Sequence, residues 1–510
     1  VLFVNTLVFR PGCGKCFKQI RLCNLIKSCC NRQDFCFKNR KYINRENMLT
    51  GRDKMELSKK AFKAYDIRGI VPGEVNAELA YRVGRVFAAM FAAETAVVGH
   101  DIRLTGPELA NAVADGLRDG GCTVYDIGEC GTEMVYYATA HLNTDGGIMV
   151  TASHNPADYN GMKLVRSGAR PVSSDTGLMD IGRMATEEGE FPHVVVAGKE
   201  RGKLIKKDIM PDYIEHLLSY IDVKNLKPLK IVANPGNGGA GPVLAKLAEH
   251  LPFEFIKINE TPDGSFPNGV PNPLLEHNRA VTADKVVAEK ADLGIAWDGD
   301  FDRCFFFDEK GEFIEGYYIV GLLAAAFLKK LPGSKIMYDP RLTWSTEEII
   351  AEKGGVPVRC KSGHAFMKEC MRLNDVVYGG EMSAHHYFRD FSYCDSGMLP
   401  WLLVTELMCC EGKKLSELVG ERMEKFPCSG EINRKVENSK AVLAAIEEKY
   451  GDGKIDKLDG LSIEYDSWRF NVRVSNTEPV MRLNVETRGD KALLKEKTEE
   501  ILAVIGGEEA

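Results

Sequence analysis

The chain has no run of eighteen or more apolar residues, so no segment is long enough to cross a bilayer as an apolar helix. It also lacks an excess of positive charge, since 73 acidic residues outnumber 66 basic ones and the formal charge is -7. Nucleic-acid-binding proteins usually carry a basic face. We therefore expect neither a membrane nor a nucleic acid as a partner. The 510 residues, 44% of them hydrophobic, predict a globular protein of several domains.

The first fifty residues have few acids and no ordinary targeting pattern. Their apolar start precedes their basic residues, which is the reverse of a secretory signal, and no small-residue cleavage site follows. A zinc module through Cys13 and Cys16 would need a second cysteine pair at metal-site spacing, which is missing. An organelle-targeting segment is also disfavoured, because such segments are rich in serine and this one is not. We expect residues 1–55 to be a basic, cysteine-rich extension outside the fold, with translation starting at Met48 or Met55.

Six of the 15 cysteines lie in that extension, and the other nine are scattered along the chain. Scattered cysteines are most simply explained by core packing in a reducing compartment. We therefore expect the protein to be cytoplasmic.

From about residue 56 onward, β-like apolar runs alternate with amphipathic helical patterns, which predicts α/β layers. A helix is expected to begin after Thr105, whose side chain would cap it. The last segment has mostly strands and one final helix, which indicates a smaller α+β domain. Expected strands are 95–99, 124–127, 147–150, 293–297, 304–307, 335–338, 376–378, 461–465, 470–474 and 481–486, and the final helix is 491–504.

One polar loop, at 151–156 (Thr-Ala-Ser-His-Asn-Pro), follows directly from an expected strand. The hydroxyl of Ser153 could accept a phosphoryl group if the anion is held by amides, cations and a metal ion, and His154 adds a hydrogen-bonding group. Lys163 lies close in sequence, where an acid/base or phosphate-binding amine would be useful. The alternative is an ordinary hydrogen-bonded turn, because serine, asparagine and proline all favour turns.

A second loop places Asp298, Asp300 and Asp302 at alternate positions after an apolar strand. Such a carboxylate cluster suits Mg²⁺, and Arg303 could pair with a phosphate. The spacing also matches part of a calcium EF-hand loop. However, Arg303 occupies the position that needs glycine, and both flanks are typical of strands, so an EF-hand is disfavoured.

Two further motifs have the residue pattern of a ligand-binding site: one could bind an anion, and the other formally matches a dinucleotide-binding sequence. The segment beginning at Arg473 offers a guanidinium, hydroxyls and a turn that could bind one anion, although a polar hairpin is the alternative. Gly236 to Gly241 formally satisfies the G-x-G-x-x-G dinucleotide fingerprint. Pro235 interrupts the junction of strand and glycine, and this interpretation would leave the other loops unused, so a glycine turn that opens a helix is preferred.

Taken in their order along the chain, the motifs of residues 57–510 resemble those of the α-D-phosphohexomutase superfamily, most closely of its bacterial phosphomannomutase branch. The resemblance implies four domains around a central cleft, three with mixed α/β sheets and a smaller α+β domain at the C-terminus. The expected limits are 56–205 for the phosphoserine domain, 206–303 for metal binding, 304–426 for sugar recognition and 427–510 for phosphate binding.

The resemblance also implies a role for each motif residue. Ser153 would carry the phosphoryl group and complete a Mg²⁺ site with Asp298, Asp300 and Asp302. Glu381 and Ser383 would read the sugar hydroxyls. The other catalytic candidates are Arg68, His154, Lys163, Arg303, His364 and His385. The residues expected to bind the second phosphate are Arg473, Ser475, Asn476, Thr477 and Arg482.

The implied reaction interconverts mannose 6-phosphate and mannose 1-phosphate through a phosphoserine enzyme and a hexose 1,6-bisphosphate, which would also be the activator. Met382 in the Gly-Glu-Met-Ser loop favours the mannose/glucose branch. A phosphoglucomutase or dual-specificity enzyme is the alternative, and a metal-dependent sugar phosphatase or a non-catalytic sugar-phosphate sensor is less favoured. A hexose phosphate is the expected partner, with no obligatory protein partner.

Overall fold

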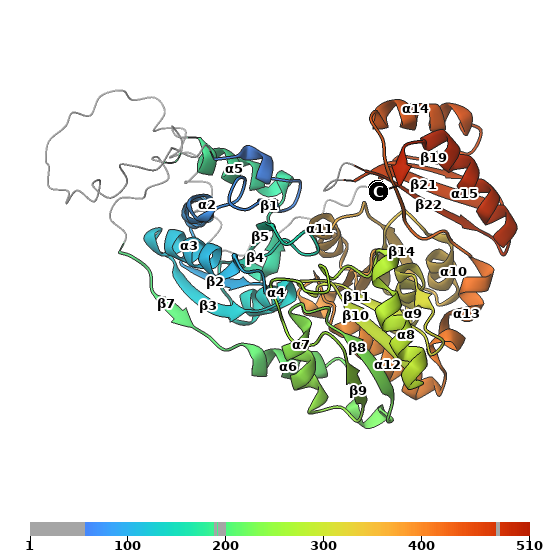
Figure 1. Cartoon of the computed structure of the whole chain (residues 1–510), viewed down its shortest axis with the longest axis horizontal. Coiled ribbons are helices and arrows are strands. Elements are labelled where there is room, and N and C mark those ends of the chain that lie inside the picture. Colours follow the sequence, from blue (N-terminus) through green and yellow to red (C-terminus); the bar gives the residue numbers. More distant parts are fainter. Residues whose placement is uncertain (1–56, 188–190, 192–199, 476–479, 510) are drawn as a thin grey trace, which may run out of the picture. The chain divides into compact units, whose positions relative to one another are not determined.

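The structure is a computed structural model that describes residues 57–187, 191, 200–475 and 480–509, all within the unit Leu57–Ala510. Four sheets follow one another along the chain (Figure 1). Among the described residues, no helix is long and apolar enough to cross a membrane. The expected extension at 1–55 lies outside the described residues.

The first sheet has the strand order β1-β5-β4-β2-β3-β7, with β6 paired to β5. Its strands are β1 (Ile67–Ile70), β2 (Thr95–His100), β3 (Thr123–Glu129), β4 (Gly146–Val150), β5 (Tyr159–Arg166), β6 (Arg170–Pro171) and β7 (Leu204–Lys206). The associated helices are α2 (Ala77–Met90), α3 (Gly106–Asp119), α4 (Thr132–His141) and α5 (Leu178–Thr186). β4, β2 and β3 are parallel, whereas β5 is antiparallel to β4, so the sheet is mixed.

Helix α3 begins one residue after Thr105, as the sequence predicts, but the predicted side-chain cap is wrong. The Thr105 side chain makes no capping hydrogen bond, because its hydroxyl accepts a hydrogen bond from the Asn160 side chain at 2.9 Å. A tertiary contact has therefore replaced the local one.

The second sheet has the order β12-β11-β10-β8-β9. Its strands are β8 (Lys230–Asn234), β9 (Glu254–Lys257), β10 (Leu293–Trp297), β11 (Cys304–Phe307) and β12 (Phe313–Ile314), and its helices are α6 (Met210–Leu218), α7 (Ala240–Ala248) and α8 (Ala280–Glu289). β11 is antiparallel to β10, so this sheet continues past residue 303, the expected end of its domain. The glycine turn at 236–239 is followed by α7.

The third sheet has the order β14-β13-β15-β16-β17. Its strands are β13 (Lys335–Tyr338), β14 (Val356–Arg359), β15 (Tyr378–Gly380), β16 (His386–Phe388) and β17 (Cys394–Asp395). Its helices are α9 (Gly316–Lys330), α10 (Trp344–Glu352), α11 (His364–Asn374), α12 (Leu399–Glu411) and α13 (Leu415–Lys425).

The fourth sheet, β19-β20-β21-β22-β18-β23, is wholly antiparallel. Its elements are β18 (Ile432–Lys435), β19 (Lys454–Asp456), β20 (Leu461–Glu464), β21 (Trp468–Val474), β22 (Met481–Thr487), β23 (Glu508–Glu509), α14 (Ser439–Lys449) and α15 (Lys491–Ile505). These elements bury their own apolar cluster, in which Phe470 and Ile501 are fully buried. The fold class predicted from the sequence, three mixed α/β domains and a smaller α+β domain, is confirmed.

The first three sheets share one connection that positions the polar loops. In each, a strand that is parallel to one neighbour is followed by a strand antiparallel to it: β4 by β5, β10 by β11, and β15 by β16. The connecting segments contain Ser153, the three aspartates and Glu381, respectively. Each loop therefore leaves the carboxyl end of a parallel strand, which is where α/β sheets bind ligands.

Candidate active site

The predicted site residues converge on one cleft of about 750 Å³. Residues from all four sheet regions line it, so segments far apart in the sequence face a common space. The predicted residues that line it are Arg68, Ser153, His154, Lys163, Arg303, His364, Glu381, Ser383, His385, Arg473, Ser475 and Arg482. Asn476 and Thr477 lie outside the described residues.

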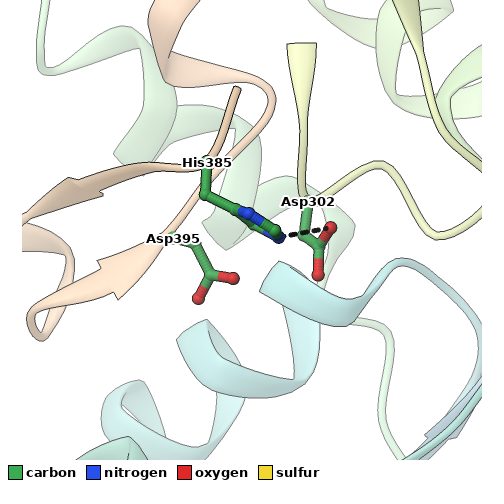
Figure 2. A group of neighbouring side chains, drawn as sticks. All are labelled: Asp302, His385 and Asp395. Carbon is green, nitrogen blue, oxygen red and sulfur yellow. Dashed lines mark ion pairs between the residues drawn. The ribbon is translucent and has the colours of Figure 1, made fainter. Parts of the chain in front are cut away.

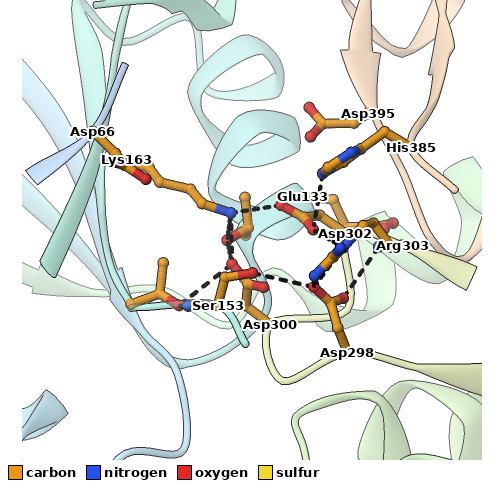
Figure 3. Close-up of polar contacts among 12 residues, drawn as sticks. Asp66, Glu133, Ser153, Lys163, Asp298, Asp300, Asp302, Arg303, His385 and Asp395 are labelled. Atoms are coloured by element: carbon orange, nitrogen blue, oxygen red, sulfur yellow. Dashed lines mark hydrogen bonds and ion pairs between the residues drawn. The ribbon is translucent and has the colours of Figure 1, made fainter. Parts of the chain in front are cut away.

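Ser153 occupies a tight turn between β4 and β5. Its φ of 51° is in the left-handed region, which few non-glycine residues adopt, so surrounding contacts must hold this conformation. The Ser153 hydroxyl is 3.1 Å from Oδ2 of Asp298 and donates a hydrogen bond to it (Figure 3). The proposed nucleophile therefore lies directly beside the aspartate loop, as the sequence analysis required.

The three aspartates form a buried carboxylate cluster beneath the cleft. Asp298 and Asp300 are fully buried and Asp302 is 1% exposed, and one oxygen from each lies within 4.8 Å of the others. The Oδ1 atoms of Asp300 and Asp302 have no hydrogen-bond partner among the described residues. Unpaired buried oxygens are costly unless a ligand takes them up. Three clustered carboxylates with free oxygens can hold a hard divalent cation.

Two cations partly neutralise this cluster (Figure 3). The Lys163 ammonium donates to Asp300 at 2.7 Å and to Asp302 at 2.5 Å, and Arg303 donates through Nε and Nη2 to Asp298 at 2.9 and 2.7 Å. Burial alone would lower the pKa of Lys163, but the two aspartates outweigh it and raise the pKa. Burial raises the pKa of Asp298 to about 6 despite Arg303 beside it. Lys163 is therefore held in its charged form.

His385 joins the aspartate loop to the loop that follows β15. Its backbone forms an antiparallel bridge with Arg303, its Nε2 is 3.6 Å from Asp302, and its Nδ1 is 3.3 Å from Glu381. Figure 2 shows the imidazole reaching toward Asp302, with the Asp395 carboxylate beside it. Burial would lower the pKa of His385, but the nearby carboxylates of Asp302 and Glu381 raise it to about 9. This imidazole is therefore suited to carry a proton.

His364 has the opposite electrostatic environment. The ring is 8% exposed, and neither ring nitrogen has a hydrogen-bond partner among the described residues. Burial, together with the nearby Lys368 ammonium, lowers its pKa well below the usual value. The side chain of Tyr65 packs edge-on against it, with ring centroids 4.8 Å apart. His364 thus offers the cleft a neutral imidazole with unoccupied nitrogens.

His154 and Arg68 flank the Ser153 loop. Nη2 of Arg303 lies 2.6 Å from Nδ1 of His154, and burial together with Arg303 lowers the pKa of His154 well below the usual value. Arg68 donates to the Asn155 side chain at 2.6 Å and to Asp66 at 2.5 Å. Both residues line the cleft next to the Ser153 loop.

The loop after β15 presents Glu381 and Ser383 to the cleft. Glu381 accepts hydrogen bonds from the Tyr387 hydroxyl at 2.5 Å and from the Gly363 amide at 2.9 Å. Burial would raise its pKa, but His385 and Arg341 hold the pKa well below the usual value. The carboxylate is therefore ionised and fixed in position, as a hydrogen-bond acceptor for hydroxyl groups must be.

A group of arginines lines the cleft around one glutamate. Glu431, which the sequence analysis missed, pairs with Arg341 at 3.0 Å, with Arg482 at 3.3 Å and with Arg473 at 3.6 Å. Arg341 was also missed; it donates to the Ser383 hydroxyl at 3.2 Å. Arg341 lies three residues after the end of β13, and neither Arg341 nor Glu431 carries a local sequence signal that could have identified it.

Comparison with known proteins agrees with this arrangement. Four regions match phosphoglucomutase/phosphomannomutase domains: residues 59–190 match alpha/beta/alpha domain I, 211–311 domain II, 315–426 domain III and 431–504 the C-terminal domain.

Similar proteins include the phosphohexose mutases of Xanthomonas campestris pv. campestris strain B100, which are 58% identical over 449 residues, 88% of this chain and 99% of theirs. The phosphomannomutase of Salmonella montevideo is 57% identical over 451 residues, covering 87% of this chain and 98% of its own. A crystal structure of a phosphoglucomutase/phosphomannomutase family protein from Burkholderia thailandensis is 32% identical with a TM-score of 0.75, and covers 88% of this chain and 98% of its own. With its four domains matched in order, the chain belongs to the phosphoglucomutase/phosphomannomutase family of phosphohexomutases.

Proposed function

We propose that this chain is a phosphomannomutase that interconverts mannose 6-phosphate and mannose 1-phosphate through a phosphoserine at Ser153 and a hexose 1,6-bisphosphate. The observation that carries the proposal is the hydroxyl of Ser153 at 3.1 Å from Asp298, inside a cleft whose other end is lined by arginines. The 57% identical phosphomannomutase of Salmonella montevideo supports the choice of mannose.

The donor set fits Mg²⁺, which Asp298, Asp300 and Asp302 would hold together with a phosphate oxygen on Ser153. When bound, such a cation draws charge from the phosphoryl oxygens and so favours transfer. Lys163 and Arg303, both paired to these carboxylates, are placed to hold the same oxygens.

The transfer itself needs positioning and one proton acceptor. A free sugar hydroxyl attacks the phosphorus, the bond from phosphorus to Oγ of Ser153 breaks, and the hydroxyl proton passes to a base. His364 suits this base, because its imidazole is neutral and lines the cleft. His385, with its raised pKa, suits the return of a proton to the leaving oxygen.

The second phosphate would be held and not transferred. Arg473 and Arg482 line the cleft and would grip it, with Ser475, Asn476 and Thr477 completing this contact. Glu381 and Ser383 would hydrogen-bond to the sugar hydroxyls between the two phosphate positions. For the reaction to finish, the bisphosphate must turn around, so that the new phosphate occupies the arginine end while the old one returns to Ser153.

One incubation tests the proposal. Purified protein is mixed with mannose 1-phosphate, Mg²⁺ and a trace of hexose 1,6-bisphosphate, and products are followed by phosphorus NMR. Formation of mannose 6-phosphate supports a mutase. Free inorganic phosphate would indicate a phosphatase, and unchanged substrate with measurable binding would indicate a sensor.

Intact-mass measurement tests the nucleophile. The protein as isolated should carry a phosphate increment that Ser153→Ala lacks, with nearly all turnover lost. Ser219→Ala, on an exposed helix end, is the matched control and should keep both. Full turnover in Ser153→Ala would refute the assignment.

A dual-specificity enzyme is the second candidate, because the relatives from Xanthomonas campestris bear the broader name phosphohexose mutases. Mannose and glucose differ only at C2, and a loop that reads other hydroxyls cannot separate them. Comparing kcat/KM for mannose 1-phosphate and glucose 1-phosphate decides between the two. We further propose that the enzyme works in the cytoplasm on small hexose phosphates, without nucleic acid or an obligatory protein partner.

A further inference from the structure

Two cysteines of one apolar cluster lie on either side, in sequence, of a segment that lines the cleft, and the proposed reaction does not use them. Cys360 follows the last residue of β14, and Cys370 lies in the second turn of α11. Both belong to a small apolar cluster that includes Met367 and Tyr387. Cys360 is 7% exposed, whereas Cys370 is half-buried and so within reach of a small solute.

Cys370 packs against the apolar cluster that contains Cys360, and each thiol shifts the pKa of the other. The neighbouring Cys360 thiol and the Asn374 side-chain amide, 3.6 Å from the Cys370 sulfur, outweigh burial and lower the pKa of Cys370 to about 7. Cys370 therefore ionises more readily than an ordinary thiol, and the thiolate is the nucleophilic form of cysteine. Burial has the opposite effect on several other described cysteines and raises the pKa of Cys130, Cys304, Cys394, Cys409 and Cys428.

The pair has the features of an oxidation site rather than of simple core packing. A partly exposed thiol of lowered pKa, with a second thiol in the same cluster, is the usual arrangement of a redox-sensitive cysteine and its resolving partner. We propose that Cys360 and Cys370 are a peroxide-sensitive pair that forms a reversible intramolecular disulfide.

The chemistry balances with hydrogen peroxide as oxidant. The Cys370 thiolate attacks one peroxide oxygen, the O–O bond breaks, and the leaving hydroxide takes up a proton to give water. The sulfur of Cys360 then attacks the sulfenic sulfur of Cys370, the S–O bond breaks, and hydroxide leaves as a second water with the Cys360 proton. Two thiols and one peroxide thus give one disulfide and two waters, and a dithiol reductant reverses the change.

The disulfide would disturb the cleft, because the segment between the two cysteines lines it. Ser362, Gly363 and His364 all face the cleft. The Ser362 amide donates to Asp459 at 3.0 Å, and the Gly363 amide donates to Glu381 at 2.9 Å. Bonded sulfurs lie about 2 Å apart, far closer than any non-bonded contact, so the end of β14 must shift toward α11. That shift would misplace His364 and the backbone that orients Glu381.

The experiment uses the reduced full-length chain, treated with a graded excess of hydrogen peroxide and then blocked with an alkylating agent. Proteolysis after glutamate separates the two cysteines into peptides 353–369 and 370–381. We expect these two peptides to appear joined, lighter by two hydrogens, and to separate after dithiothreitol. Cys360→Ser and Cys370→Ser should each abolish the joined peptide. Cys410→Ser, which changes an exposed cysteine, is the control and should leave it intact.

Activity provides the second measurement and rests on the proposed mutase function, whereas the joined peptide does not. We expect peroxide to reduce kcat/KM by between about tenfold and a hundredfold, since a displacement of about 1 Å near reacting groups can cost that much. Dithiothreitol should restore it, and Cys360→Ser should resist the reversible loss. A peroxide-treated chain in which Cys370 is unmodified, over-oxidised or linked to another cysteine would overturn the proposal.

Discussion

Arg103 holds the loop of the proposed nucleophile, although it lies outside every motif that the sequence analysis identified. The residue is 1% exposed and follows β2. Its guanidinium donates to the backbone carbonyls of Ser153 at 2.9 Å, Asn155 at 2.6 Å, Pro156 at 2.6 Å and Tyr159 at 2.9 Å. One planar side chain therefore fixes four successive points of the turn in which Ser153 has its left-handed conformation.

The same side chain is tied to the aspartate loop through two intermediates. Asp101 pairs with Arg103 at 3.4 Å and accepts a hydrogen bond from the Thr151 hydroxyl at 2.7 Å. That hydroxyl in turn accepts from the Ser153 amide at 2.8 Å and lies 3.3 Å from Asp300. Arg103 is thus linked both to Ser153 and, through Asp101 and Thr151, to the aspartate cluster.

Arg103→Lys tests this dependence while keeping the charge beside Asp101. An ammonium has three donors for the four carbonyls, so at least one charge-assisted hydrogen bond is lost, at about 1.5–3 kcal/mol. If that energy is needed to hold the turn during transfer, kcat falls by about ten- to a hundredfold. KM for the sugar phosphate should stay nearly constant, because the arginine end of the cleft is untouched.

The assay is steady-state kinetics on mannose 1-phosphate, with intact mass reporting the phosphorylated fraction and thermal unfolding reporting stability. The matched control is Arg118→Lys, near the end of α3, where the guanidinium donates to Gly202 and Asp115. We expect the control to keep wild-type kcat. A wild-type kcat and phosphorylated fraction in Arg103→Lys would show that the turn keeps its conformation without the guanidinium, and would refute the reasoning.

Three further outcomes are expected. Glu431→Gln should lower KM by about tenfold, because one carboxylate several ångström from a bound phosphate repels it by on the order of 1 kcal/mol or more; a raised KM would mean that Glu431 orients the arginines. Burial would raise the pKa of Glu431, but Arg482 and Arg341 lower it to about 2. The ionised carboxylate therefore adds about 3 kcal/mol to the free energy of unfolding above pH 4.5, and this contribution is lost as the pH falls toward 2. Urea unfolding at pH 5 and pH 3 should show this loss in the wild type and much less of it in Glu431→Gln. Asp300→Asn should weaken Mg²⁺ binding measured by calorimetry by about tenfold or more, with Asp308→Asn, outside the cluster, as a neutral control.

The positions of the polar loops could be predicted because each follows a short, strongly apolar strand. β10 and β11, expected at 293–297 and 304–307, have those limits in the structure. β15 was expected at 376–378 but spans Tyr378–Gly380, because its register is set by pairing with β13 and β16 and not by local apolar content. Two of its three residues are glycines, which have low strand propensity, so side-chain propensities do not predict this strand.

The missing parts of the site are those whose roles arise only from tertiary contacts. Arg103, Arg341 and Glu431 are ordinary charged residues in the sequence, and nothing local distinguishes them from surface residues. In the structure all three are at most about one-tenth exposed and pair with groups far away along the chain. A charged residue can be buried only where partners compensate it, and the partners are not visible until the fold is known. Their roles therefore could not be predicted from spacing.

The charge of the reaction centre explains why its parts must act together. Leaving aside His385, which lies 3.6 Å from Asp302, three carboxylates and two cations leave one net negative charge in a site that excludes most water. A phosphoryl group on Ser153 adds nearly two more negative charges at neutral pH. Burying three net negative charges would be very costly. A divalent cation bound to the free oxygens of Asp300 and Asp302 would reduce the charge of the centre to about one net negative charge. The phosphorylated serine and the cation should therefore stabilise each other, which fits a centre that keeps its phosphoryl group between turnovers and releases it only to a hydroxyl inside the cleft.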